Sequence, residues 1–305
     1  MKTFFGYFRD YFNKVSFIRL LLTTTLVAIL IFVNYHWGIE SRIKRLPGHV
    51  SQLLVFYIFY LSVFGIAYFI SLFNDFRVSI IDRNNFFLLL LVAPFFFALK
   101  MVEWRFFFLN QFDPAWQKYW TIVLQWPIKL GLLIIVLWLL LPLNHKLDSF
   151  WGLTVRDLKI WPYVFLLLCI VPFILLASAQ RDFLLAYPKF KNILFLSPYV
   201  STLWPWKLLF EISYGLDFLS IELFFRGFLV IGFARFVDWR AILPMAAFYC
   251  TIHFGKPWGE CVSSYLGGAA LGIIAFRTET IVGGLLVHLG IAYAMELGGW
   301  IHLFG

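Results

Sequence analysis

The chain has 305 residues, of which 62% are hydrophobic, 21% aromatic and only 13% charged. Soluble domains are about 45–50% apolar and about 25% charged, so this composition excludes an ordinary soluble globular protein. The net charge of +9 does not indicate nucleic-acid binding, because the Lys and Arg residues are spread over short loops and helix ends, where they anchor helices to lipid headgroups. We predict an all-α protein, a polytopic transmembrane helical bundle.

The apolar segments recur along the whole chain. The first segment, Met1 to Ser16, mixes basic and aromatic residues and predicts an amphipathic helix at the membrane interface rather than a cleaved signal. A spanning helix needs about 20 mostly apolar residues. We expect eight or nine spans, some of them short or broken, at residues 17–33, 52–73, 85–102, 121–143, 163–179, 208–236, 241–253, 262–276 and 281–300.

Two parts of the chain differ in their ionisable residues. Residues 1–147 carry few charges within their apolar segments, and we predict that they form a transmembrane scaffold. Residues 148–305 carry acidic, basic and histidine side chains in or beside apolar segments, namely Glu211, Asp217, Glu222, Arg226, His253, Glu260, His288 and Glu296. An ionisable group at membrane depth is expensive and usually marks a functional site. We therefore place any chemistry in the second part.

Glu222 and Arg226 lie four residues apart in an apolar segment, which on an α-helix puts them on one face. The carboxylate can neutralise the guanidinium, and a structural ion pair between helices is one interpretation. His253 and His288 lie on two further apolar segments and suggest another. A carboxylate can take a proton from water that one histidine holds, while a second histidine donates to the oxyanion. Two imidazoles and a carboxylate also suit zinc, although no HExxH motif occurs, so the metal stays unknown.

The cysteines do not indicate a disulfide framework. Cys169, Cys250 and Cys261 are odd in number, all lie in or beside apolar segments, and no CxxC pair occurs. We interpret them as small buried hydrophobic residues.

The order of these residues resembles the CPBP family, the CAAX proteases and bacteriocin-processing intramembrane proteases. The family's EExxxR motif matches Glu222 and Arg226, its FxxxH motif matches Tyr249 and His253 with Tyr in place of Phe, and its last histidine matches His288. The resemblance covers about residues 150–300, within a predicted CPBP-like domain of residues 148–305, and leaves about four N-terminal helices outside it. It implies an intramembrane endopeptidase fold, in which the matched Glu222 is a partner for the Arg rather than the base. We predict Glu222, His253 and His288 as the catalytic residues, at a site that requires no cofactor. The predicted supporting residues are Arg226, Tyr249, Asp217, Glu260 and Glu296.

Two family positions are apolar here. The first Glu of the EExxxR motif aligns with Ile221, and the Asn or Asp four residues after the last histidine aligns with Ala292. Glu222 does not simply replace the missing Glu, because adjacent helical positions point about 100° apart. Replacement carboxylates are therefore considered among nearby acidic residues, namely Glu211, Asp217, Glu260 and Glu296.

Three functions follow from these features. The first is hydrolysis of a peptide bond in a membrane-associated peptide or protein. The second is a catalytically degenerate CPBP fold that serves as a binding or scaffold subunit beside other membrane proteins. A transporter is the third, although no paired halves of the kind common in transporters are evident. In each case the expected surroundings are lipid, in a multi-pass protein of the bacterial inner (cytoplasmic) membrane, without nucleic acid.

Overall fold

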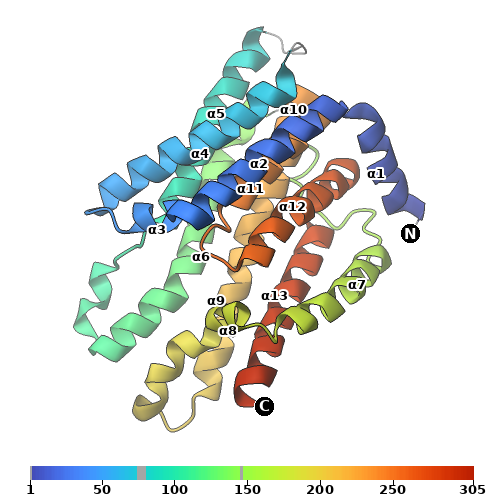
Figure 1. Cartoon of the computed structure of the whole chain (residues 1–305). Helices are drawn as coiled ribbons and strands as arrows, with labels where there is room; N and C mark the ends of the chain where they lie inside the picture. The colour runs from blue at the N-terminus through green and yellow to red at the C-terminus, as the bar shows by residue number, and fades with distance from the viewer. Residues whose placement is uncertain (1, 74–79, 145–146) are drawn as a thin grey trace. The chain divides into compact units, whose positions relative to one another are not determined.

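The structure is a computed structural model that describes residues 2–73, 80–144 and 147–305 (Figure 1). Throughout these ranges the regular secondary structure is helical, and no strand occurs in them. The predicted all-α class is confirmed. The α-helices are α1 (Lys2–Lys14), α2 (Phe17–Trp37), α3 (Ile39–Lys44), α4 (His49–Leu72), α5 (Ile80–Met101), α6 (Pro114–Leu140), α7 (Trp161–Ala177), α8 (Arg181–Ala186), α9 (Trp204–Glu222), α10 (Phe233–Val237), α11 (Ile242–Thr251), α12 (Trp258–Thr278) and α13 (Val282–Phe304).

Several tighter or wider turns connect these helices. The 3-10 helices are η1 (Phe107–Gln111), η2 (Leu141–Leu143), η3 (Lys189–Tyr199) and η5 (Asp238–Ala241). One wider segment, η4 (Leu223–Gly232), is a π-helix that begins directly after α9. Such π-helical turns are rare and often accompany functional sites.

Within the described ranges, six helices are long and apolar enough to cross a membrane. They are α2, α4, residues 82–101 of α5, residues 114–143 with α6, α12 and α13. The other segments expected to span also form helices, but they differ in length or charge: α7 has 17 residues, α11 has 10, and α9 carries three carboxylates. The chain is an integral membrane protein, and the shorter helices account for the difference from eight or nine spans.

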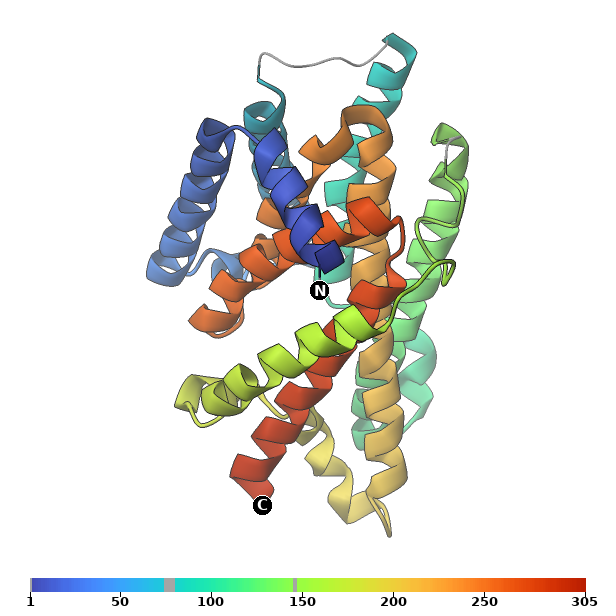
Figure 2. The same ribbon diagram turned by 90° about the vertical axis from the view of Figure 1, so that its right-hand side faces the viewer.

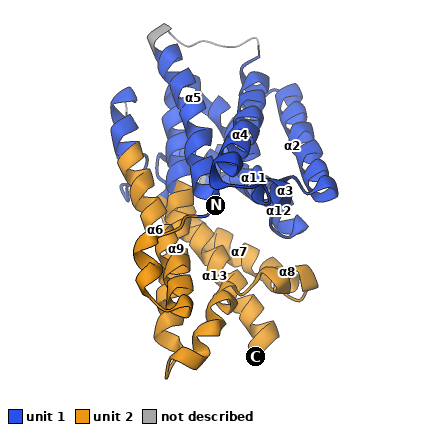
Figure 3. Cartoon of the chain, turned by 90° about the vertical axis from the view of Figure 1, so that its left-hand side faces the viewer, with its two compact units in different colours: residues 1–103, 137–156, 223–281 blue, residues 104–136, 157–222, 282–305 orange. Residues whose placement is uncertain are grey.

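The chain folds into two compact units, coloured blue and orange in Figure 3. Unit 1 comprises residues 1–103, 137–156 and 223–281, and unit 2 comprises residues 104–136, 157–222 and 282–305. The boundary between Glu222 and Leu223 falls inside the predicted Glu-Arg motif. The division at residue 147 was drawn from sequence resemblance and stays a prediction.

Unit 1 has an aromatic core between α4, α5, η4 and α11. The rings of Tyr60 and Phe248 lie 5.1 Å apart, and Phe97 lies 5.1 Å from Phe225. The first pair is tilted and the second is edge-to-face, and aromatic pairs in such arrangements add stabilisation beyond the area that they bury. They matter in a membrane protein, because helix association in lipid depends on van der Waals packing rather than on the hydrophobic effect.

A short segment after α6 fixes the π-helix within unit 1. Trp151 is fully buried, and its Nε1 donates a hydrogen bond to the Leu137 carbonyl at 3.0 Å. The Ile281 N–H donates to the Gly152 carbonyl at 2.9 Å, which joins this segment to the chain after α12. Gly227 allows the closest approach, since a Cβ there would lie 2.4 Å from the Trp151 carbonyl oxygen.

Unit 2 is organised around α13, which packs against α7 and α9 (Figure 2). Gly283 faces the ring of Tyr163 so closely that a Cβ would lie 2.0 Å from it, and Gly290 faces Leu167 in the same way, at 2.3 Å. Small residues let membrane helices approach each other closely. The glycines of α13 therefore place its backbone directly against α7.

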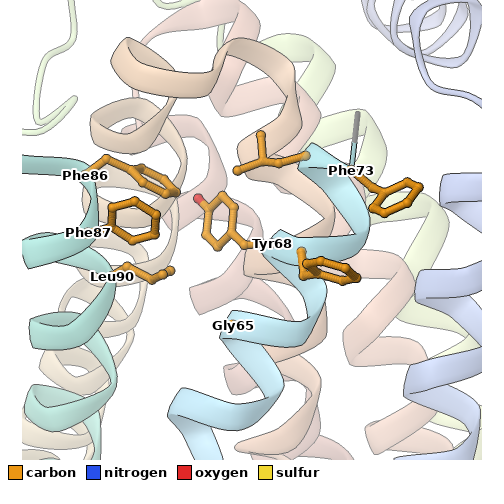
Figure 4. Close-up of a pocket in the computed structure, with 8 residues that line it drawn as sticks. Gly65, Tyr68, Phe73, Phe86, Phe87 and Leu90 are labelled. Carbon is orange, nitrogen blue, oxygen red and sulfur yellow. The ribbon is translucent and has the colours of Figure 1, made fainter. Parts of the chain in front are cut away.

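An apolar groove of about 340 Å³ lies between α4 and α5 of unit 1 (Figure 4). Tyr68, Phe86 and Leu90 are among the residues that line it, and its surface is almost wholly apolar. No carboxylate or histidine is among the residues that line this groove, so it contains none of the predicted catalytic residues.

The N-terminal segment and the three cysteines were also assigned from the sequence. The N-terminal segment forms the helix α1, which buries Tyr11 and exposes Phe5 and Phe12. Cys250 and Cys261 are buried as expected, but the expectation was wrong for Cys169, which is exposed. Cys169 lies on the apolar helix α7, and an apolar residue next to lipid does not need to be buried in protein.

Gly227→Ala tests the contact between η4 and Trp151. The added methyl would meet a backbone oxygen that has no freedom to rotate away, so we expect a loss of about 1–3 kcal/mol in the free energy of unfolding. Thermal unfolding in detergent measures it. Gly267→Ala on α12 is the matched control, because its Cβ would meet nothing within 4 Å. Equal melting temperatures for the two variants would contradict the close contact between Gly227 and the Trp151 carbonyl.

Candidate functional site

Glu222 and His288 meet in unit 2. Glu222 ends α9, and His288 lies in the second turn of α13. His288 Nδ1 lies 2.9 Å from Glu222 Oε1. The Glu222 side chain is fully buried, whereas 14% of the His288 side chain is exposed. When Glu222 is ionised, its carboxylate only accepts hydrogen bonds, so Nδ1 of His288 is the donor in this contact.

Two neighbours hold this pair in place. Gly284 lies one turn before His288, and a Cβ there would lie 2.8 Å from Glu222 Oε2. Only a glycine leaves the carboxylate this room. The ring of Phe218 meets the His288 ring at 4.8 Å and 73°, an edge-to-face arrangement. Packing and hydrogen bonding together therefore restrict the imidazole to one orientation.

Arg226, Tyr249 and His253 form a second group, in unit 1. The Arg226 guanidinium lies 4.3 Å from the centre of the Tyr249 ring, and that ring lies 4.7 Å from the His253 ring. Arg226 is 1% exposed, so its charge lies away from water and needs a favourable contact within the protein. A guanidinium over an aromatic face is attracted by the ring quadrupole, and the attraction is stronger when the pair is desolvated.

The tautomer of His253 is also defined. Its Nδ1 lies 3.0 Å from the Tyr249 carbonyl oxygen, which only accepts hydrogen bonds. His253 lies in the turn that follows α11, and α2 holds this turn from the side: Asn34 donates to the Phe254 carbonyl at 3.0 Å, and Tyr35 donates to the Lys256 carbonyl at 2.6 Å. The turn is therefore anchored directly after the histidine, on its C-terminal side.

Both histidines thus present the same chemistry. Each uses Nδ1 as a donor to an oxygen, which leaves Nε2 of the neutral ring as a proton acceptor or metal ligand. In the described part of the chain, no group of three or more His, Cys, Asp or Glu side chains is placed to hold a metal ion. Histidines in such an arrangement commonly take part in proton transfer.

The supporting carboxylates have partners of their own. Glu260, in the first turn of α12, pairs with Lys256 at 3.3 Å. Glu296 is buried and accepts hydrogen bonds from the backbone N–H of Lys189, at 2.7 Å, so it fixes the start of η3. Asp217 is half-buried on α9, next to Phe218. A direct role in chemistry for these three residues stays a prediction.

The two apolar replacements are part of the packing. Ile221 is 8% exposed and Ala292 is 2% exposed. Ala292 belongs to a hydrophobic cluster of unit 2 that includes Phe210 and Tyr214. A polar side chain at position 292 would enter this cluster and lose its contacts with water, which carries a free-energy cost. The surroundings of this position are therefore adapted to an apolar residue.

Comparison with known proteins gives one match. Residues 202–294 match the sequence model of the family described as Type II CAAX prenyl endopeptidase Rce1-like. This confirms the predicted resemblance to the CPBP family. The CPBP-like segment contains every predicted catalytic residue and ends two residues before Glu296. Neither the curated proteins nor the solved structures contain a match to the chain.

The predicted α-helix through Glu222 and Arg226 is wrong. Instead, α9 ends at Glu222 and the π-helix η4 begins at the next residue. Alpha-helical spacing therefore does not apply, and the ion pair between these residues stays a prediction. The contact between Glu222 and His288 joins segments 66 residues apart, and the only signal for it was the family motif that contains both.

A double-mutant cycle tests the Glu222–His288 contact. Glu222→Leu and His288→Leu should each destabilise the protein, and the double variant should lose about 1–3 kcal/mol less than the sum, because each single change strands a buried polar partner. Unfolding in mixed detergent micelles gives the free energies. His302→Leu, at an exposed position of the same helix, should be additive with Glu222→Leu. Additivity within about 0.5 kcal/mol in both cycles would show that the contact is not energetically coupled.

A second pair of variants tests the stacking of Arg226 on Tyr249. Tyr249→Phe keeps an aromatic face for the guanidinium, whereas Tyr249→Leu removes it. We expect the Leu variant to lose about 0.5–2 kcal/mol more than the Phe variant, measured by thermal unfolding in detergent. Equal stability of the Tyr249→Leu and Tyr249→Phe variants would contradict a stabilising contact between Arg226 and the Tyr249 ring.

Proposed function

We propose that this protein is a CPBP-type intramembrane endopeptidase that hydrolyses a peptide bond of a membrane-associated substrate. The observation that carries the proposal is the hydrogen bond of 2.9 Å between buried Glu222 and partly exposed His288. A carboxylate that holds Nδ1 fixes the tautomer and the orientation of the imidazole. The match of residues 202–294 to a prenyl endopeptidase family supports the reaction class.

The proposed reaction needs no covalent intermediate. His288 Nε2 accepts a proton from a water molecule while the water oxygen bonds to the carbonyl carbon of the substrate. The carbonyl oxygen becomes an oxyanion, and Glu222 stabilises the imidazolium that forms. The imidazolium then gives its proton to the amide nitrogen as the carbon–nitrogen bond breaks. The products are a carboxylic acid and an amine, and His288 returns to its neutral form.

His253 and Arg226 have supporting roles in this proposal. The family resemblance assigns His253 to catalysis as well, as a group that binds water or, when protonated, donates to an oxyanion. Arg226 is stacked on Tyr249 and places a positive charge in the unit that carries His253. In this proposal the Glu222–His288 pair is the base, and His253, Arg226 and Tyr249 contribute electrostatically.

The substrate class follows from the surroundings of His288. It lies on α13, one of the helices able to cross a membrane, so water and peptide must reach the site at or within the bilayer. We infer a peptide from a protein that is anchored in or attached to the membrane, and we place the enzyme in the inner membrane of a bacterium.

A second function is favoured by a specific observation. Ile221 and Ala292 occupy family positions that are polar in the CPBP motifs, and both are buried in packed surroundings. A chain that had lost these groups would keep the fold and serve as a binding or scaffold subunit of a membrane complex. This alternative predicts a stable partner and no peptide cleavage.

A cleavage assay in lipid nanodiscs separates the two functions. We expect the wild-type chain to cleave members of a membrane-peptide library, and we expect Glu222→Gln and His288→Ala each to lower kcat/KM by about 100-fold or more, since a positioned base contributes roughly 10²–10⁴. His253→Ala should lower it as well. His302→Ala is the matched control, because this histidine is exposed at the end of the same helix. Cleavage indifferent to the Glu222 and His288 variants would refute the proposal, and co-purification of a partner with an inactive chain would favour the scaffold.

A further inference from the structure

Two of the three cysteines lie in contact inside unit 1. Cys250 Sγ is 3.8 Å from Cys261 Sγ. Each sulfur also approaches the carbonyl oxygen of the other residue, at 3.4 Å and 3.9 Å. Both residues are free thiols and neither has exposed surface. The two side chains are therefore directed at each other, across the contact between α11 and α12.

The pair flanks the turn that carries His253. Cys250 lies near the end of α11, and its carbonyl accepts a hydrogen bond from the His253 N–H at 3.0 Å. Cys261 lies in the first turn of α12, and its N–H donates to the Pro257 carbonyl at 3.0 Å. A covalent link between the two sulfurs would therefore close the backbone on both sides of the histidine.

We propose that Cys250 and Cys261 form a redox-active dithiol, whose oxidation to a disulfide ties together the two ends of the turn that carries His253. A disulfide needs the sulfurs at about 2.05 Å, so each must move by only about 1 Å, which side-chain rotation supplies. The eleven-residue separation gives a short closed ring, in which few backbone rearrangements remain possible. The three-cysteine composition did not predict this pairing, because the pattern of spacing showed no motif.

The oxidant is a peroxide. One thiol attacks a peroxide oxygen, the oxygen–oxygen bond breaks, and a sulfenic acid and water result for hydrogen peroxide. The second sulfur then displaces the hydroxyl group from the sulfenic acid, and a second water leaves. The two sulfurs together lose two electrons and two protons, and the peroxide is reduced to two molecules of water.

The surroundings favour this class of oxidant. The two cysteines belong to an apolar cluster of unit 1 with Val27, Val63 and Phe254. A small uncharged peroxide enters such a cluster at a lower desolvation cost than a charged thiol reagent does. The same cluster shields the disulfide after it has formed, so reduction requires local opening of the turn or a small neutral dithiol.

Mass spectrometry of the full chain tests the pairing. The protein in nanodiscs is treated with hydrogen peroxide, free thiols are alkylated under denaturing conditions, and the digest is searched for a peptide that joins Cys250 to Cys261. We expect the joined peptide to weigh about 2 Da less than its two thiol peptides together, from loss of two hydrogens. Cys250→Ser and Cys261→Ser should each abolish it, and Cys169→Ser should leave it unchanged. Dithiothreitol should reverse it.

Hydrogen exchange tests the effect on the turn. In the oxidised protein, the amides of residues 252–256 should exchange about tenfold more slowly than in the reduced protein, because the closed ring limits local opening. The Cys250→Ser variant should show no such change. If peroxide gives only separate sulfinic or sulfonic acids at these cysteines, or leaves both alkylated, the proposal is overturned. Unchanged exchange in the cross-linked protein would overturn the effect on the turn.

The consequence for catalysis rests on the proposed function and is measured separately. If the chain is a peptidase, oxidation should lower cleavage at least several-fold in the wild type and not in Cys250→Ser. An inactive chain that still forms the cross-link would end the peptidase proposal and leave the dithiol intact. An active chain that does not form the cross-link would end the dithiol proposal and leave the peptidase proposal intact.

Discussion

The hydrogen bond between Glu222 and His288 is the constraint on which the rest of the candidate site depends. The Glu222 carboxylate is fully buried at the end of α9. Burial of an ionised carboxylate costs roughly several kcal/mol unless the group is paired and hydrogen-bonded. His288 supplies that partner from a helix that follows in the sequence 66 residues later. The bond therefore has two consequences: it makes a buried carboxylate tolerable, and it fixes the orientation of the His288 imidazole.

Close helix packing makes that bond possible. The glycine at position 284 leaves room for the carboxylate, and the other glycines of α13 place its backbone against α7. In lipid, such close approach replaces the hydrophobic driving force that packs soluble helices. The same principle acts in unit 1, where Gly227 admits the Trp151 carbonyl beside the π-helix. Backbone proximity, rather than a large apolar core, thus determines where the polar side chains of both units lie.

Composition and periodicity were sufficient to predict a helical membrane protein, because apolar length is a local property of the sequence. The family motif was sufficient to select Glu222, His253 and His288, since it records which residues act together. Neither source predicted the π-helix after Glu222 or the burial of Trp151, because both depend on contacts between distant segments. Local spacing was misleading for the Glu-Arg motif for this reason: it assumed a regular helix where packing produces a wider one.

The two apolar replacements can be understood through the same contacts. In a site where an additional carboxylate and an amide assist catalysis, Glu222 would serve only as a partner for other residues. Here position 221 is apolar and Glu222 binds the His288 imidazole directly, and in the proposed reaction this pair is the base. Position 292 lies in a packed hydrophobic cluster, where a polar side chain would disturb unit 2. The loss of two polar groups and the formation of a carboxylate–imidazole pair are therefore consistent with one arrangement, in which fewer residues carry the proton transfer.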